Sequence, residues 1–261
     1  MSELARCEVG DEVATVTLDS PHNRNALSAQ LVAEVSARLS EAGADPAVRA
    51  VVLTHTGRVF CSGADLAAAG AGPRRSRQGT QLGGSGAAIM DLLRLIVELP
   101  KPVIARIAGH VRAGGMGIVG ACDLAVAAQD ASFAFTEARI GLAPAMISLT
   151  TLDIMDPRQA RRYYLTGETF GASVAARLGL ITSVCTGEEL DGVVAGLAAQ
   201  IRETSPQGAA ETKLLLNAPR RQRLDAAGPA MTELSARLFG SDEAQEGIRA
   251  FLEKRLPAWR A

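Results

Sequence analysis

The sequence predicts a mixed α/β fold, and three observations support that prediction. Apolar and polar side chains alternate over residues 12–18, which is typical of a half-buried strand, and the apolar runs 50–54 and 103–107 are typical of buried strands. Apolar residues at helical spacing appear over 29–42 and 87–99. The later part of the chain is mostly helical in character. Strands and helices therefore alternate early in the chain, and helices dominate its end.

Length, charge and cysteine spacing exclude several classes of protein. A chain of 261 residues is long enough for one large domain, and its formal net charge of −1 gives no basic footprint for nucleic acid or anionic membrane. No apolar run approaches the roughly 18 residues of a membrane span, and the N-terminus lacks the plan of a signal peptide. The cysteines lie far apart without a C-x-x-C pair, which argues against a zinc site or a disulfide framework. We expect a soluble cytoplasmic protein without a metal, binding neither nucleic acid nor membrane.

The first part of the chain predicts a loop, a capped helix and a flexible segment. Residues 22–27 form the loop, and Ser28 is placed to cap the helix over 29–42. Residues 59–66 predict a short strand and a turn. The segment 67–86 has almost no large apolar residues and cannot bury enough surface to offset its ordering entropy. We expect this segment to be a mobile or ligand-ordered loop before the helix over 87–99.

A repeat of strand, strand and helix is visible in the middle of the chain. The apolar runs 124–128 and 132–135 predict a hairpin about Gln129 and Asp130. Because the order strand, strand, helix occurs twice, the sequence favours a repeating ββα unit over a plain βαβ unit.

The remainder predicts helices and one short strand. We expect a domain boundary near Thr204, which divides the chain into a core of residues 1–204 and a helical region of residues 205–261. The expected strand covers 180–185, and the expected helices cover 147–155, 157–166, 172–178, 188–202, 206–217, 223–239 and 242–255.

Two adjacent glycines, Gly114 and Gly115, open an apolar segment that carries no charge until Asp123. A glycine pair at a helix start leaves main-chain N–H groups exposed, and the helix dipole adds a partial positive charge there. Such donors suit a phosphate, a carboxylate or an oxyanion. From these residues alone, all three ligands stay open.

The same glycines contain the pattern Gly115-x-Gly117-x-x-Gly120, which matches the fingerprint of a dinucleotide site. That site needs the motif directly at a strand-to-helix turn, with an acidic residue ending the next crossover strand. Here the motif begins six positions after Gly109, and Glu137 follows the expected hairpin. A nicotinamide site is therefore disfavoured.

Several motifs together resemble the enoyl-CoA hydratase/isomerase (crotonase) family. They are residues 59–66, the glycine pair, and the pattern Phe133-x-Phe135-Thr-Glu137-x-x-x-Gly141-Leu-x-Pro144, with further similarity along nearly the whole chain. The resemblance implies a crotonase-like spiral of ββα units with a C-terminal helical trimerisation region. It also implies an acyl-CoA substrate, no cofactor beyond the coenzyme A of that substrate, and a homotrimer or a dimer of trimers.

The resemblance also assigns catalytic positions. In the family, two main-chain N–H groups bind the thioester oxygen, and the matching residues here are Ala64 and Gly114. Family hydratases commonly use two glutamates; the second matches Glu137, but the first position holds Gly117, which cannot transfer a proton. The remaining positions match residues that contact coenzyme A in the family: Arg24, Ala26, Asp65, Leu66, Phe251 and Lys254.

One carboxylate is enough for a 1,3-proton shift, whereas two normally share the work of adding water. That chemistry favours a double-bond isomerase. Finer similarity over 141–148, 160–167 and 249–259 to bacterial hydratases of glutaconyl-type CoA esters favours a hydratase. We expect hydration of a 2-enoyl-CoA thioester, branched and glutaconyl-type esters being candidates. The alternatives are a Δ3,Δ2-enoyl-CoA isomerase and a non-catalytic acyl-CoA-binding protein.

Two arginines lie near the expected acyl site. Arg112 precedes the glycine pair, and Arg139 follows Glu137. Either side chain could bind a carboxylate at the far end of the acyl group.

Overall fold

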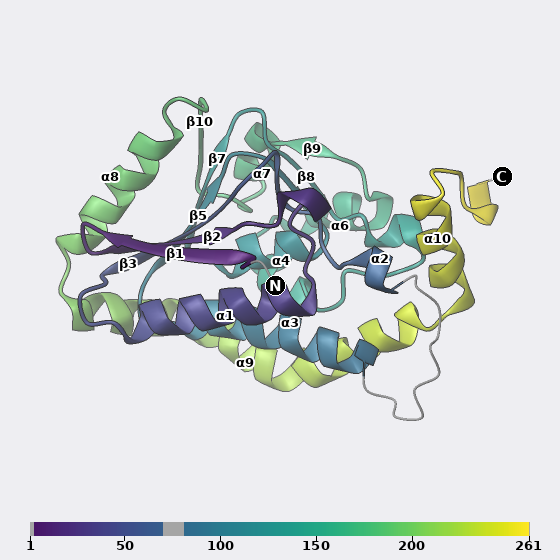
Figure 1. Ribbon diagram of the computed structural model, residues 1–261, viewed down its shortest axis with the longest axis horizontal. Helices are drawn as coiled ribbons and strands as arrows, with labels where there is room; N and C mark the ends of the chain where they lie inside the picture. The colour runs from purple at the N-terminus through teal and green to yellow at the C-terminus, as the bar shows by residue number, and fades with distance from the viewer. Residues whose placement is uncertain (1–2, 70–80, 261) are drawn as a thin grey trace.

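The computed structural model describes residues 3–69 and 81–260, and the side chains of all of these except 68, 69 and 81–85. Its strands form a six-stranded sheet in the order β1-β2-β3-β5-β7-β10 and a four-stranded sheet in the order β4-β6-β8-β9 (Figure 1). The strands are β1 Ala5–Gly10, β2 Val13–Leu18, β3 Ala50–His55, β4 Val59–Cys61, β5 Val103–Ile107, β6 His110–Arg112, β7 Leu124–Ala128, β8 Ser132–Ala134, β9 Phe170–Gly171 and β10 Ser183–Cys185.

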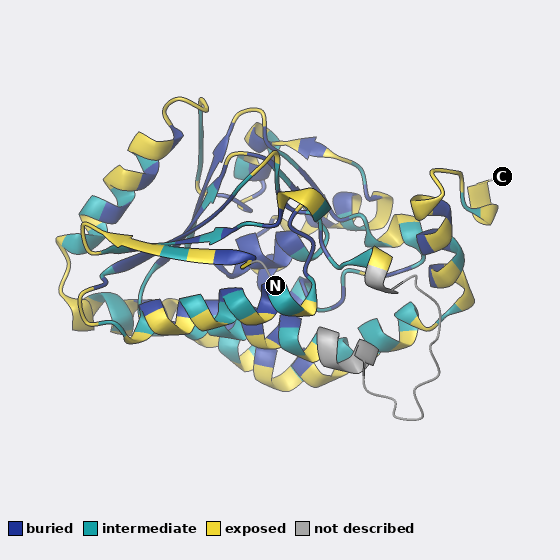
Figure 2. Cartoon of the chain, in the orientation of Figure 1, coloured by how far each residue is buried: buried dark blue, intermediate teal, exposed yellow. Residues whose placement is uncertain are grey.

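Helices cover both faces of the large sheet. The α-helices are α1 Ala29–Ala44, α2 Leu66–Ala69, α3 Gln81–Glu98, α4 Gly114–Ala121, α5 Ser148–Thr151, α6 Pro157–Thr166, α7 Ala172–Arg177, α8 Leu190–Arg202, α9 Pro206–Phe239 and α10 Asp242–Leu252; the 3-10 helices are η1 Pro21–Asn23, η2 Glu137–Ile140 and η3 Ala258–Arg260. On one face of β3, Val51 and Leu53 join the main core, while Val52 on the other face packs in a smaller cluster with Leu190 and Val194 of α8. Because both faces are buried (Figure 2), the central strands β3 and β5 are mostly apolar.

The predicted ββα repeat is confirmed, but the predicted hairpin is wrong. β7 pairs with β5 and β10 in the large sheet, whereas β8 pairs with β6 and β9 in the small one. The turn at Gln129 and Asp130 therefore carries the chain from one sheet to the other instead of folding it back. The pairs β3–β4 and β5–β6 divide between the sheets in the same way, and this repetition makes a spiral.

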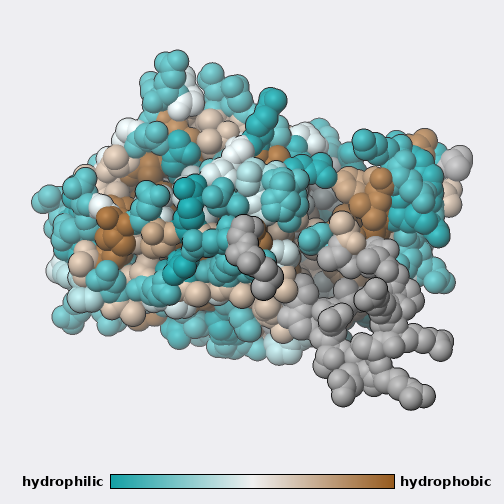
Figure 3. All heavy atoms as spheres, viewed as in Figure 1, coloured by the Kyte–Doolittle hydropathy of each residue, from teal (hydrophilic) through white to brown (hydrophobic). Residues whose placement is uncertain are grey.

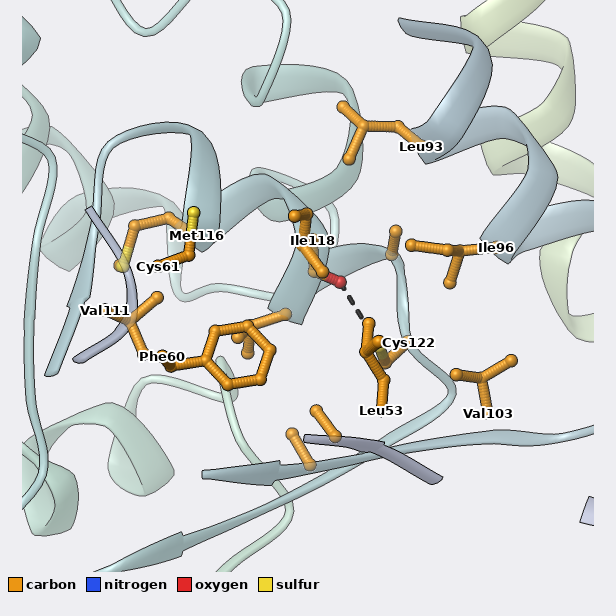
Figure 4. Close-up of a cluster of buried hydrophobic side chains, with 14 of the residues drawn as sticks. Leu53, Phe60, Cys61, Leu93, Ile96, Val103, Val111, Met116, Ile118 and Cys122 are labelled. Atoms are coloured by element: carbon orange, nitrogen blue, oxygen red, sulfur yellow. Dashed lines mark hydrogen bonds between the residues drawn. The ribbon is translucent and has the colours of Figure 1, made fainter. Parts of the chain in front are cut away.

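The glycine-rich helix α4 lies in the middle of the core. Figure 4 shows its Met116 and Ile118, with Cys122 just after its last residue, among apolar side chains from β3, β4, β5, β6 and α3. The glycines let the helix approach its neighbours: a Cβ on Gly115 would lie 2.8 Å from Cβ of Cys61, and one on Gly120 would lie 2.6 Å from the carbonyl oxygen of Thr150. These glycines serve close packing, and the dinucleotide interpretation finds no support in them.

The expected loop over 67–86 is wrong at both ends, and its residues 70–80 lie outside the described part. α2 covers residues 66–69, and α3 begins at Gln81, six residues before the predicted start at 87. Packing explains the early start, because a Cβ on Gly86 would lie 3.5 Å from Thr232 on α9. Tertiary contact here outweighs the low helix propensity of glycine.

The predicted helices over 206–217 and 223–239 are one helix, α9, which contains Pro219 and Pro229. Each proline removes a main-chain hydrogen bond. Packing against α3 and buried polar contacts compensate: Lys213 forms an ion pair with Asp123 at 2.7 Å. The predicted division at Thr204 stays a prediction.

Smaller differences concern short elements. β1, which pairs with β2 across a tight turn at Asp11 and Glu12, and β6 were both missed. The helix predicted over 147–155 is only Ser148–Thr151, and the strand predicted over 180–185 begins at Ser183. Among the described helices, none combines the length and apolar character needed to cross a bilayer.

Candidate active site

The loop between β2 and α1 is tied to β4 at both of its ends. The Nδ2 atom of the buried Asn25 donates hydrogen bonds to the carbonyl oxygens of Thr56 (3.1 Å) and Val59 (2.8 Å). The amide of Leu27 donates to the carbonyl oxygen of Gly63 at 2.8 Å. The Asn25 bonds hold the start of β4, and the Leu27 bond holds the turn that follows it.

Gly63 and Gly114 bring two main-chain amides close together. Gly63 has φ of +90°, and a Cβ there would lie 2.6 Å from Cβ of Ala113, so both the backbone and the space require glycine. A Cβ on Gly114, the first residue of α4, would lie 3.9 Å from the amide nitrogen of Ala64. No residue in the described ranges accepts a hydrogen bond from the amide of Ala64 or Gly114. Both N–H groups are therefore available to a ligand.

Glu137 is the first residue of η2, shortly after the end of β8. Its carboxylate oxygen Oε2 is buried, and no hydrogen-bond partner for it exists among the described residues. Burial raises the pKa of Glu137 to about 7, and a hydrogen bond from its own main chain offsets the effect only in part. A carboxyl group with a pKa near neutrality can both accept and return a proton at physiological pH.

One cavity of about 740 Å³, a size typical of small-molecule sites, is lined by Ala64, Gly114 and Glu137. It brings together every predicted site residue except Lys254, which is exposed beyond the end of α10. The other lining residues among those predicted are Arg24, Ala26, Asp65, Leu66 and Phe251.

Ile147 fills the space next to Gly117, the position where family hydratases commonly carry the first of their two glutamates. A Cβ on Gly117 would lie 2.5 Å from Cγ2 and 2.9 Å from Cβ of Ile147. Two buried hydroxyls fix this contact: Thr150 donates to the carbonyl oxygen of Gly117 at 2.9 Å, and Thr151 donates to that of Ile147 at 2.7 Å. Ile147 also lines the cavity, so an apolar wall stands where a second carboxylate would project.

The two candidate arginines differ in their surroundings. Arg139 is exposed, and its Nε donates to the carbonyl oxygen of Thr166 at 3.0 Å. Arg112 is half-buried, and its guanidinium donates to Ser132. Both side chains line the cavity.

Part of the cavity wall was missed in the sequence. Ile89 of α3 and Ser235 and Phe239 of α9 line it, together with Ile147. The helical spacing of Ile89 indicated only core packing, and nothing in the sequence linked α3 to α9. Figure 1 shows the two helices side by side along one edge of the molecule.

The spiral of ββα units and the cavity at its strand ends are those of the crotonase fold. The chain belongs to the enoyl-CoA hydratase/isomerase family, whose family model matches residues 8–261. It is 34% identical over 251 residues to a candidate enoyl-CoA hydratase of Thermus thermophilus, covering 94% of this chain and 96% of that protein. It is also 29% identical over 256 residues to the mevalonyl-coenzyme A hydratase of Aspergillus fumigatus, covering 95% and 91% of the two chains.

Comparison with a solved structure supports the same family and fold. The crystal structure of an enoyl-CoA hydratase from Mycobacterium avium is 49% identical, with a TM-score of 0.89, over 99% of this chain and 100% of that one. The fold and family predicted from the motifs are thus confirmed.

Proposed function

We propose that this protein hydrates a 2-enoyl-CoA thioester, with Glu137 as its single acid/base group. One observation carries the proposal: the cavity is lined by two residues whose main-chain amides, and one whose carboxylate oxygen, have no hydrogen-bond partner in the part of the chain that the structure describes. The hydratase names of the relatives support the same reaction.

The amides of Ala64 and Gly114 would bind the thioester oxygen. When water adds to the double bond, the π electrons move through C2 onto that oxygen as an enolate. Preorganised N–H donors stabilise this charge, and losing one such donor typically lowers the rate by about 10²–10³.

Glu137 would move the proton. Its carboxylate accepts a proton from water while the water oxygen bonds to C3, and the same carboxyl group then returns the proton to C2. A pKa of about 7 suits both steps, because neither protonation state is strongly favoured at neutral pH. The scheme requires no metal and no cofactor other than the coenzyme A of the substrate.

The contact between Gly117 and Ile147 favours a second candidate, a Δ3,Δ2-enoyl-CoA isomerase. The apolar wall removes the second carboxylate that would help to hold water. A 1,3-proton shift needs only the amides and Glu137, which could take a proton from C2 and return it at C4.

Turnover of crotonyl-CoA, a 3-enoyl-CoA and a glutaconyl-CoA, followed by thioester absorbance, separates these functions. We expect hydration of a 2-enoyl-CoA by the wild type and by the exposed control Glu188→Gln, and none by Glu137→Gln, which still binds acyl-CoA. Turnover of the 3-enoyl-CoA alone would show that the protein is an isomerase and not a hydratase. Binding without any turnover would indicate a non-catalytic protein. Full activity in Glu137→Gln would place the base elsewhere.

Substrate contacts and assembly extend the proposal. Arg24, Ala26, Asp65 and Leu66 would contact coenzyme A, with Phe251 and Lys254 acting from the same or a neighbouring subunit. We propose a homotrimer or a dimer of trimers, located in the cytoplasm. Support for assembly comes from apolar side chains near α10, where Figure 3 also shows hydrophobic surface; the exposed fractions are 51% for Phe251, 56% for Leu256 and 45% for Trp259.

A further inference from the structure

Arg112 lines the cavity with a half-buried guanidinium whose hydrogen-bond partners, among residues 3–69 and 81–260, are all neutral. The residue ends β6, two positions before Gly114. Within the described residues, its guanidinium donates to three oxygens: the carbonyls of Val111 (2.9 Å) and Ser132 (2.6 Å) and the hydroxyl of Ser132 (2.8 Å). By contrast, the buried Arg220 pairs with the carboxylate of Asp153 at 2.9 Å.

The hydrogen bonds of Arg112 leave one edge of the guanidinium unused. Of the five N–H groups, Nη1 uses two on the carbonyls of Val111 and Ser132, and Nη2 uses one on the Ser132 hydroxyl. Since Ser132 accepts from both Nη atoms, it faces the edge between them. The groups left are the Nε–H and the second N–H of Nη2, which lie on a common edge. That pair is the fork that binds carboxylates and phosphates through two parallel hydrogen bonds.

The surroundings of this edge are electropositive. His110 also contacts the Ser132 hydroxyl, at 3.0 Å through Nδ1. Burial lowers the pKa of His110, and the positive charges of Arg112 and Arg58 lower it further. Holding a cation partly out of water without a counter-ion is costly, so an anionic ligand would be favoured here.

We propose that the free edge of Arg112 binds an anionic oxygen group of the substrate. The required chemistry is a pair of negatively charged oxygens, which a carboxylate at the far end of the acyl chain or a phosphate of coenzyme A could supply. The inference rests on the proposed function, because it takes a CoA thioester as the ligand.

Calorimetric binding of three unreactive thioesters distinguishes the sources. Glutaryl-CoA carries a carboxylate and phosphates, butyryl-CoA carries phosphates only, and butyryl-pantetheine carries neither. Each is titrated into the wild type, Arg112→Gln, Arg112→Lys and the control Arg106→Gln, whose half-buried guanidinium pairs with Asp191 instead. Thermal melts check that each variant is folded.

We expect Arg112→Gln to weaken glutaryl-CoA binding by about 10- to 100-fold, the range for a charged bidentate contact. Arg112→Lys keeps the charge without the fork and recovers part of the loss, while Arg106→Gln binds like the wild type. A loss confined to glutaryl-CoA identifies the carboxylate; a loss shared by both CoA esters but not the pantetheine ester identifies a phosphate. Equal effects on all three ligands, or none, would overturn the role of Arg112. Failure of the wild type to bind any CoA ester would overturn the proposed function as well.

Discussion

The Cγ2 atom of Ile147 lies 2.5 Å from the point that a Cβ atom on Gly117 would occupy. This contact explains why position 117 carries no side chain, so no carboxylate reaches the cavity from that position. The effects of substituting Gly117 and Ile147 on the free energy of unfolding should therefore depend on each other.

A double-mutant cycle tests that coupling. Gly117→Ala should lower the free energy of unfolding by about 1–3 kcal/mol through overpacking, and Ile147→Ala by about 2–5 kcal/mol through the cavity it leaves. In the Ile147→Ala background the 2.5 Å contact with Cγ2 is removed, whereas Cβ at position 147 still lies 2.9 Å from the added methyl, so Gly117→Ala should cost less than it does in the wild type. Chemical denaturation measures all four proteins, and additive losses would show that the two side chains do not share this space.

Gly63→Ala should damage both stability and activity. Its φ of +90° and the 2.6 Å approach to Cβ of Ala113 force the Ala64 amide to move, which should reduce kcat by about 10²–10³. The matched control is Gly196→Ala in α8, where nothing lies within 4 Å of the added Cβ; it should raise stability by about 0.5–1 kcal/mol and leave kcat unchanged. Unchanged kcat in folded Gly63→Ala would remove the Ala64 amide from the mechanism.

Glu137 should make the folded protein less stable as the pH rises. Its pKa is about 7 in the folded state against an ordinary 4.5, so the folded protein holds this proton more tightly than the unfolded chain. The stabilisation is fully present below pH 4.5 and is lost as the pH rises to 7, a change of about 3 kcal/mol. Glu137→Gln should therefore be more stable than the wild type at pH 8 and similar at pH 4. Parallel stability curves for the two proteins would contradict a buried carboxylate.

The buried ion pair of Lys213 and Asp123 should hold α9 against the core. Lys213 also donates to the carbonyl oxygens of Ile96 (2.9 Å) and Lys101 (3.0 Å). Lys213→Ala leaves the Asp123 carboxylate without its ion-pair partner and should cost about 3–5 kcal/mol. The surface pair of Arg94 and Asp225 provides the comparison, because Arg94→Ala should cost about 0–1 kcal/mol. Similar losses in both variants, measured by urea denaturation, would assign no special role to the buried pair.

The sequence signals that led to the predicted site are local. Gly63, Gly114 and Glu137 each sit in a short motif at the end of a strand, and the spiral brings those ends to one cavity. Ser235 and Phe239 carry no such motif; they reach the cavity only because α9 packs along α3.

Strand pairing was harder to predict than strand position. The runs over 124–128 and 132–135 were correctly predicted as strands, but a short polar turn is compatible both with a hairpin and with a step between two sheets. Pairing depends on what lies beyond the turn: β6 and β9 take β8 into the small sheet. The prolines of α9 likewise led to a wrong prediction of two helices. Local helix propensity could not anticipate the buried contacts of Lys213 and Arg220, which hold the helix together.

Exchange of the C2 protons of butyryl-CoA in deuterated water tests the central claim most directly. The exchange requires only that two amides stabilise an enolate and that one carboxylate moves the proton, whichever reaction the protein finally catalyses. We predict that NMR will show deuterium entering C2 with the wild type but not with Glu137→Gln, although both bind the ligand. Equal exchange in the two proteins, or no exchange in a wild type that binds butyryl-CoA, would contradict the account.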